Sequence, residues 1–263
     1  MPTPSHAPQT LAATPTRRIS AIGHLRVVVR AAVMAALLAA CVPLYYFCRL
    51  TRLANPFPRI FLAGVSWLAG IELRIKGERP HLGALLIANH VSWIDIPAIA
   101  AATGSAFVGH DGLASVTLLR HLCAMNDTVF IARHDRTRVS EQIEQVRAAI
   151  RDTGALTIFP EGTTSDGTGL LPFKSSLLSA ALPLPEGMAV IPVLLDYGAE
   201  AAQLAWVGDE PGLTNFRRIL ARARPVRLTV HFLPVLVGEA LSDRKAMAAA
   251  ARAAIAGAMV PQH

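Results

Sequence analysis

The sequence is poor in aromatic residues and cysteines and lacks the common hydrolase motifs, and each shortage excludes a class of protein. Aromatic residues make up only 6% of the chain, whereas nucleic-acid-binding surfaces combine clustered basic residues with interleaved aromatic ones. The three cysteines show neither a CxxC pair nor any spacing typical of a metal site or a disulfide framework. No G-x-S-x-G motif of a serine hydrolase is present. We therefore expect no nucleic-acid partner, no metal ion and no disulfide framework.

Charged residues are also scarce, at 16% of the chain, while hydrophobic residues reach 52%. Ordinary soluble domains carry about 25% charged residues. The remaining charge is unbalanced: the formal net charge is +7, and arginine supplies every cation except Lys76, Lys174 and Lys245. A chain that is both apolar and basic is typical of a protein that binds an anionic membrane surface.

The N-terminal part of the chain divides into a polar leader and an apolar segment. Residues 1–22 are rich in Pro, Thr, Ser and Ala without apolar periodicity, which predicts a disordered leader. Residues 23–71 contain two apolar stretches, at 31–48 and 60–71, which predict membrane-associating helices. As a helix, the charge-free stretch 31–48 would measure ~27 Å against a hydrocarbon core of ~30 Å, and Pro43 would kink it. The two helices either cross the bilayer or dip into one leaflet.

Arginines flank the apolar segment on both sides, so the positive-inside rule gives no orientation. No small-residue cleavage site precedes a new polar start, which disfavours a cleavable signal peptide. Since no disulfide framework indicates an oxidising compartment, we expect the inner (cytoplasmic) membrane, with the following domain facing the cytoplasm.

Residues 72–263 alternate between short apolar runs and helical stretches. The runs, read as strands, lie at 72–77, 84–89, 105–109, 128–132, 155–159, 189–195 and 226–232. Helices are expected at 93–102, 112–123, 137–152 and 174–181, and at 242–258 with Ser242 as N-cap. Nearly continuous apolar strands are typical of a sheet covered on both faces. The pattern predicts one α/β domain, a layered sandwich with a largely parallel central sheet flanked by helices.

Polar residues follow three of these strands. Asn89 and His90 come directly after one strand, Arg133 after another, and residues 159–167 after a third. In open α/β sheets, ligands bind beyond the carboxyl ends of the strands. The sequence therefore predicts that these groups line one crevice.

His90 and Asp95 are suited to act together as a base and the group that orients it. Neutral imidazole is a general base near pH 7, and a carboxylate on one ring nitrogen fixes the tautomer. On a regular helix the two residues would be ~140° apart and would not meet. They meet if the chain turns sharply after His90 and a helix starts near Ser92 as N-cap, with Asp95 at its third position. A buried histidine satisfied by a structural aspartate explains the same pattern.

Two further segments carry groups that bind anions. Residues 158–176 form a loop rich in Gly, Thr and Ser that enters a helix near Lys174, which is suited to cradle a phosphate. Arg133, Arg136 and Arg138 create a positive field after the preceding strand. Each segment is equally consistent with an ordinary solvated loop.

Four short blocks, in this order, resemble a known family. "NHVSWID" (89–95) resembles the N-H-x4-D block of the glycerolipid acyltransferases, which include the 1-acylglycerol-3-phosphate acyltransferases. "TVFIARHDR" (128–136) looks like the second block, "FPEGTTSDG" (159–167) resembles the third, and "VIPV" (190–193) the fourth. The resemblance covers about residues 70–200.

The resemblance implies that residues 72–263 form a catalytic domain. It would transfer an acyl chain from acyl-CoA or acyl-carrier protein to 1-acylglycerol-3-phosphate, giving phosphatidic acid, without a metal or other cofactor. His90 would be the base, with Asp95 holding its ring. By the family's pattern, Arg133, Glu161, Gly162 and Thr163 would hold the acceptor lipid.

Two departures from the family's pattern bear on the acceptor. Thr164 stands where the family often has arginine, and His110 where it often has lysine. Both changes remove a permanent positive charge from the expected acceptor site, although Arg133, Arg136 and Lys174 remain to compensate. We include His110 and Lys174 among the expected acceptor contacts. The alternatives are another lysolipid acceptor, such as lyso-ornithine lipid, and a non-catalytic lipid-binding protein.

Overall fold

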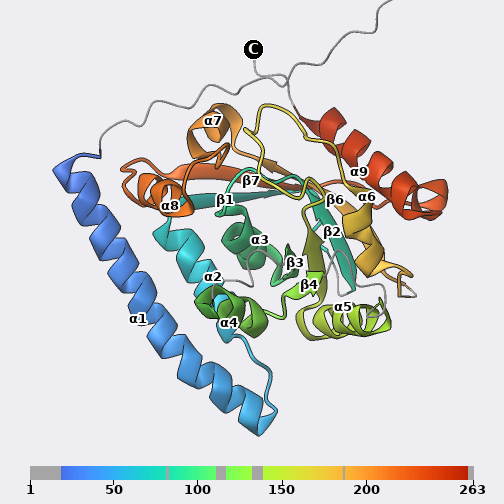
Figure 1. The fold of residues 1–263 in the computed structure, drawn as a ribbon, viewed down its shortest axis with the longest axis horizontal. Helices are drawn as coiled ribbons and strands as arrows, with labels where there is room; N and C mark the ends of the chain where they lie inside the picture. The colour runs from blue at the N-terminus through green and yellow to red at the C-terminus, as the bar shows by residue number, and fades with distance from the viewer. Residues whose placement is uncertain (1–18, 81–82, 111–116, 132–138, 186, 260–263) are drawn as a thin grey trace, which may run out of the picture.

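A seven-stranded sheet forms the centre of the molecule in the computed structural model, which describes residues 19–80, 83–110, 117–131, 139–185 and 187–259. The strands are β1 (Ile71–Lys76), β2 (Ala84–Ala88), β3 (Ala106–His110), β4 (Val129–Ile131), β5 (Ala155–Ile158), β6 (Ala189–Asp196) and β7 (Val226–Phe232). Their order across the sheet is β1-β7-β6-β2-β5-β3-β4, and every pairing is parallel except β6 with β7. The predicted layered, largely parallel sheet is confirmed (Figure 1).

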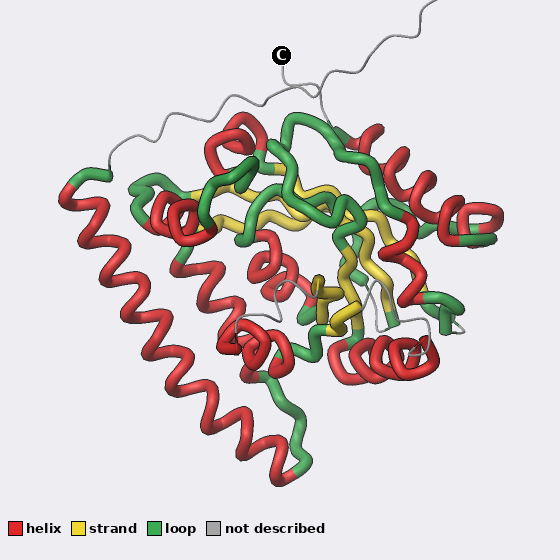
Figure 2. The backbone as a smooth tube through the Cα atoms, viewed as in Figure 1, coloured by secondary structure: helices red, strands yellow, loops and turns green. Residues whose placement is uncertain are grey.

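The sheet is covered by helices on both faces (Figure 2). One face carries α1 (Ala21–Thr51), α2 (Phe57–Leu68), α3 (Asp95–Thr103), α7 (Ala201–Leu204) and α8 (Gly212–Leu220). The other carries α5 (Val139–Thr153), α6 (Ser175–Leu178) and α9 (Arg244–Ala258). The remaining elements are α4 (Thr117–Met125), near the end of α1, and the 3₁₀ turns η3 (Ser179–Ala181), η4 (Gly198–Glu200) and η5 (Gly238–Leu241).

The central strand β2 shows how the sequence produces two cores. Its five residues are all apolar and buried. Because successive side chains on a strand point to opposite faces, Leu86 packs in the core beneath α2 and α3. Leu85 and Ile87 pack in the core beneath α5 and α9. A polar residue on either face of β2 would be buried without water, which explains the uninterrupted apolar run.

Helix α1 is longer than the apolar stretch that predicted it. It begins after the N-cap Ser20, whose Oγ accepts a 3.1 Å hydrogen bond from Gly23 N, and continues through Pro43. The expected end of the leader, at residue 22, therefore falls inside the helix, and residues 1–18 lie outside the described part of the chain. With 31 residues, α1 is long and apolar enough to cross a membrane by length and composition, and it indicates membrane association.

One side of α1 packs on the rest of the molecule and the other is exposed. The buried side presents residues at helical spacing toward α2, namely Met34, Cys41, Tyr45 and Cys48. The exposed side carries large apolar residues, namely Ile22, Leu25, Val28, Val29, Val33 and Phe47. Arg30 donates hydrogen bonds of 2.8 Å to Leu220 O and 3.2 Å to Arg222 O, at the C-terminal end of α8. The helix is therefore fixed to the sheet domain while offering an apolar face outward.

One prediction about the C-terminal half is wrong in detail, and two of its helices were missed. The N-cap of α9 is Asp243, not Ser242, because the Asp243 carboxylate accepts from Lys245 N at 2.6 Å and Ala246 N at 2.9 Å. Helices α7 and α8 were not expected, although Ile219 and Leu220 of α8 are fully buried against the sheet.

Candidate active site

The predicted pair of His90 and Asp95 meets at the carboxyl end of β2. His90 Nδ1 lies 2.7 Å from Asp95 Oδ2, and the Asp95 side chain is completely buried while that of His90 is 17% exposed. Because a carboxylate accepts, Nδ1 carries the ring proton of the neutral imidazole. Nε2 then holds a lone pair, and it has no partner among the described residues. The ring can therefore take a proton from a molecule that approaches its exposed edge.

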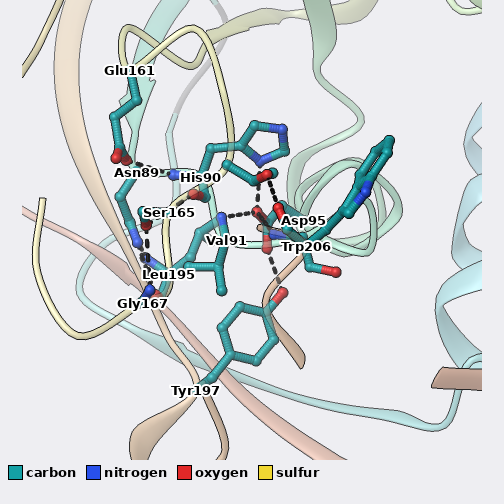
Figure 3. A network of polar contacts seen from close by, with 12 residues as sticks. Asn89, His90, Val91, Asp95, Glu161, Ser165, Gly167, Leu195, Tyr197 and Trp206 are labelled. Carbon is teal, nitrogen blue, oxygen red and sulfur yellow. Dashed lines mark hydrogen bonds and ion pairs between the residues drawn. The ribbon is translucent and has the colours of Figure 1, made fainter. Parts of the chain in front are cut away.

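The chain joins His90 to Asp95 by a different turn from the one expected. We predicted Ser92 as the N-cap of a helix containing Asp95, but α3 begins at Asp95 itself and no side chain caps it from in front. Instead the Asp95 carboxylate folds back, and Oδ2 accepts from Val91 N at 2.7 Å and Ser92 N at 2.9 Å (Figure 3). The carboxylate thereby satisfies two backbone N–H groups of the turn that precedes α3. Local backbone donors thus lock the carboxylate that orients the imidazole.

Tyr197, which sequence reasoning missed, supplies the fourth donor to Asp95. Its hydroxyl, just beyond β6, donates to Asp95 Oδ1 and is buried with the carboxylate. Burial, and next the negative charge of Asp95, raises the pKa of the Tyr197 hydroxyl well above its ordinary value, so it stays protonated. The sequence held one signal: Tyr197 follows an apolar strand end, as His90 does.

The loop after β5 clamps the backbone of His90 from both sides. Glu161 Oε1 accepts from His90 N at 2.9 Å, and Glu161 Oε2 accepts from Leu171 N at 3.0 Å. Ser165 N and Ser165 Oγ donate to His90 O at 2.7 and 3.1 Å. Burial raises the pKa of the Glu161 carboxyl, against the lowering effect of its two backbone donors. The loop therefore fixes the position of the imidazole.

Two further contacts hold the imidazole and the strand end. The ring of Phe159 stacks on the ring of His90, with 4.2 Å between centroids. Asn89 extends the pairing of β2 with β6, because its side-chain oxygen accepts from Leu195 N at 2.7 Å and its nitrogen donates to Leu195 O at 3.2 Å. The His90 ring is therefore held by a stacked aromatic ring and follows directly on a strand end that is itself paired.

Some of the residues expected to hold the acceptor are exposed in the structure, and others are turned inward. Gly162 and Thr163 are exposed on the loop, and a Cβ at Gly162 would lie 3.1 Å from Lys174 Nζ, so the ammonium lies beside Gly162. Glu161 faces inward, as described, with a side chain that is 1% exposed. Thr164, which replaces the family's arginine, turns its hydroxyl to Trp206 O.

The two other residues expected to contact the acceptor are Arg133 and His110. Arg133 lies outside the described residues, as do Arg136 and Arg138. His110 is described only as the last residue of β3, which runs parallel to β5 and so ends at the same edge of the sheet. Within the described part of the chain, no group of three or more His, Cys, Asp or Glu side chains could hold a metal ion.

The fold and the site define a class of protein: an α/β protein with a histidine–carboxylate pair at the carboxyl edge of its sheet, suited to general acid–base chemistry. Residues 71–196 match the family model described as Acyltransferase. The chain is 34% identical over 200 residues to the lyso-ornithine lipid O-acyltransferase of Rhodobacter capsulatus, covering 73% of this chain and 71% of that protein. It is 31% identical over 249 residues to the lyso-ornithine lipid O-acyltransferase of Brucella abortus, covering 86% of this chain and 91% of that protein.

This chain therefore belongs to the acyltransferase family and is an acyltransferase enzyme of the glycerolipid group. A shorter match, 34% identical over 152 residues, links it to the 1-acyl-sn-glycerol-3-phosphate acyltransferase of Neisseria gonorrhoeae, with 55% of this chain and 57% of that protein covered. The fold matches the crystal structure of the 1-acyl-sn-glycerophosphate acyltransferase of Thermotoga maritima, with a TM-score of 0.59, 17% identity, and 89% and 95% of the two chains covered. The family predicted from the four sequence blocks is confirmed.

Proposed function

We propose that this enzyme transfers an acyl chain from acyl-CoA or acyl-carrier protein to the free hydroxyl of a lysolipid, with His90 as general base. The observation that carries the proposal is the short His90–Asp95 contact, which leaves Nε2 as the proton acceptor at the exposed edge of the ring. The named activities of the relatives support acyl transfer to a lysolipid hydroxyl.

The chemical step follows from this geometry. The acceptor hydroxyl gives its proton to His90 Nε2 as its oxygen attacks the thioester carbonyl carbon. The new C–O ester bond forms, the C–S bond breaks, and the departing sulfur takes the proton from the imidazolium to leave as a thiol. Asp95 stabilises the imidazolium between the two transfers. A positioned base of this kind contributes about 10²- to 10⁴-fold to the rate.

Two acceptors are consistent with the site, and the first is a lysolipid without a terminal phosphomonoester, such as lyso-ornithine lipid. Thr164 replaces a cation of the family's pattern and points its hydroxyl at a backbone carbonyl, so it offers no charge to a phosphate. The named activities of the relatives that cover most of this chain point the same way.

The second acceptor is 1-acylglycerol-3-phosphate, which would give phosphatidic acid in phospholipid biosynthesis. The Lys174 ammonium beside Gly162 favours it, since a fixed cation at a glycine-bearing loop suits a phosphate. Arg133, by the family's pattern, would add a second cation.

We place the enzyme at the inner (cytoplasmic) membrane, with the sheet domain in the cytoplasm, where acyl-CoA and acyl-carrier protein are available. The three described cysteines are free thiols, in keeping with a reducing compartment. Labelling of a cysteine introduced at exposed Val237 in inverted vesicles, but not in intact cells, is the expected result. Labelling of that cysteine in intact cells would contradict this orientation.

One assay tests both the reaction and the acceptor. The purified full chain is given one acyl donor and a panel of lysolipids, and thiol release is followed. His90→Ala is expected to abolish release on every acceptor while the protein stays folded and membrane-bound. His24→Ala, which removes an exposed histidine from α1, is the matched control and is expected to keep full activity. Near-normal transfer by His90→Ala would exclude the mechanism, and turnover of lysophosphatidate alone would exclude the first acceptor.

A further inference from the structure

Asp95 is held by two sets of donors that come from different parts of the chain. Its Oδ2 accepts three N–H groups, from the His90 ring and from the backbone of Val91 and Ser92. Its Oδ1 accepts the hydroxyl of Tyr197, 102 residues further along the chain, and no other donor among the described residues (Figure 3). The local turn therefore satisfies one oxygen, and Tyr197 satisfies the other.

Because it is buried, this hydrogen bond between Tyr197 and Asp95 contributes more than a hydrogen bond at the surface. Asp95 is completely buried and Tyr197 is 4% exposed, so water cannot replace the hydroxyl if it is removed. A hydrogen bond to a buried charge is strong, and a buried charge left without a donor is costly. Tyr197 also follows β6, which pairs in parallel with β2, so the segments that carry the hydroxyl and the carboxylate leave the sheet at the same edge.

We propose that Tyr197 is a positioning residue for acyl transfer, which holds the Asp95 carboxylate in the plane that orients His90 and sets how strongly Asp95 attracts the His90 proton. This inference rests on the proposed role of His90 as base. Tyr197 does not touch the reacting atoms. It acts through Asp95, by fixing the rotation of the carboxylate and by drawing part of its negative charge toward the phenol.

The expected direction of the pH effect follows from the groups that face the pair. The His90 ring contacts Asp95, interacts electrostatically with the Glu161 carboxyl, and stacks on the uncharged ring of Phe159. Asp95 is faced by His90, by Tyr197 and by the same Glu161. Removing the Tyr197 hydroxyl concentrates the negative charge of Asp95 on the imidazole side. Asp95 is then expected to attract the His90 proton more strongly, which moves the acid limb of the pH–rate profile to higher pH.

The experiment compares the pH dependence of kcat/KM in wild type, Tyr197→Phe and the control Tyr45→Phe, using the full chain in detergent. Tyr45 is a second buried tyrosine, but its hydroxyl accepts from Arg49 in α1, away from the site. Tyr197→Phe is expected to lower kcat by about tenfold or more, with KM for the lysolipid unchanged, and to move the acid limb of the profile to higher pH. Tyr45→Phe is expected to change neither.

A second variant keeps the test decisive if Tyr197→Phe fails to fold. The chain has three tyrosines, so in the double variant Tyr45→Phe/Tyr46→Phe, biosynthetic 3-fluorotyrosine labels Tyr197 alone. The fluorinated phenol is a more acidic and stronger donor, and it is expected to move the acid limb to lower pH, opposite to Tyr197→Phe.

The outcomes separate the inference from the function on which it rests. Full activity of His90→Ala overturns both the proposed function and this inference. An inactive His90→Ala together with unchanged acid limbs in the Tyr197→Phe and fluorinated proteins overturns the inference alone. A lower melting temperature of Tyr197→Phe with an unaltered kcat and pH profile assigns Tyr197 a purely structural role and likewise overturns it.

Discussion

The guanidinium of Arg30, in the middle of an apolar helix, caps the C-terminal end of α8 through Leu220 O. The 2.8 Å bond satisfies one of the carbonyl groups that have no partner inside a helix. We expect Arg30→Met to lower the free energy of unfolding by about 1 kcal/mol. Arg26→Met, one turn earlier in α1, is the control, because Arg26 has no hydrogen-bond partner in the described part of the chain. Equal melting temperatures for the two variants in detergent would contradict this role.

Asp95→Asn should remove activity while leaving the fold intact. Every contact that Asp95 Oδ2 makes is with an N–H donor, so the amide oxygen of asparagine can take that side while its nitrogen donates to the Tyr197 hydroxyl oxygen. The imidazolium would then lose the negative charge that stabilises it, and kcat should fall about 10²- to 10⁴-fold. Thiol release gives the rate and circular dichroism gives the fold. A kcat within twofold of wild type would show that the carboxylate charge is not required.

Glu161 should make the protein less stable as the pH rises. Burial raises the pKa of the Glu161 carboxyl above its ordinary value of 4.5, so the folded state binds the proton more tightly than the unfolded state. The stability that this group contributes is therefore fully present below pH 4.5 and is lost as the pH rises through its folded pKa. We expect the melting temperature of wild type, relative to Glu161→Gln, to fall over that interval. Parallel melting curves for the two proteins across the interval would contradict the raised pKa.

Gly162→Ala should weaken acceptor binding more than it weakens the fold. Gly162 has a φ of +69°, in the left-handed region, and a Cβ there would lie 3.1 Å from Lys174 Nζ. An alanine held in the left-handed conformation costs about 1–2 kcal/mol of folding free energy. Displacement of the Lys174 ammonium by the new Cβ should in addition raise KM for the lysolipid. Gly238→Ala is the matched control, since its φ of +61° carries a similar backbone cost with no atom within 4 Å of the new Cβ. Equal KM values for the two variants would show that Lys174 does not contact the acceptor.

The outer face of α1 should bind lipid. Leu25 is 62% exposed and Val29 is 52% exposed on the same side of the helix. The double variant Leu25→Glu/Val29→Glu should shift the protein from the vesicle pellet to the supernatant in a sedimentation assay, with little change in melting temperature. Val237→Glu, a change at an apolar residue that is 74% exposed near η5, should leave sedimentation unchanged. If both variants left the vesicle pellet equally, the added negative charge alone would explain the loss of binding, and the outer face of α1 would not be the lipid-binding surface.

The strands were predictable because their signal is local. Fully buried strands such as β2 need unbroken apolar runs, and each predicted run matches a strand to within about two residues. The direction of β7, which runs antiparallel to β6, was not predictable because the apolar pattern of a strand is the same whichever way the strand runs in the sheet. Helix α1 was underestimated because Arg30 looks like a polar boundary until its partner on α8 is known.

The site was predictable where the chemistry is local and unpredictable where it is not. His90 and Asp95 are five residues apart, and the strand end beside them marked the edge of the sheet where they meet. The role of Glu161 as a clamp on the His90 backbone depends on a contact across 71 residues, and that of Tyr197 on one across 102. Neither contact leaves a periodic or spacing signal in the sequence. The cap at Ser92 was wrong for a different reason: the chain makes a turn in which Asp95 N donates to Ser92 O, and α3 begins only at Asp95, so Ser92 lies three residues before the helix.

The clamp on His90 also couples the imidazole to the loop after β5. The loop that presents Gly162 and Thr163 at the surface also grips His90 N through Glu161 and His90 O through Ser165. Any displacement of that loop is therefore transmitted mechanically to the imidazole. The alignment of the imidazole and the position of the loop therefore depend on one set of hydrogen bonds, so a substitution that displaces the loop is expected to disturb the His90 ring as well.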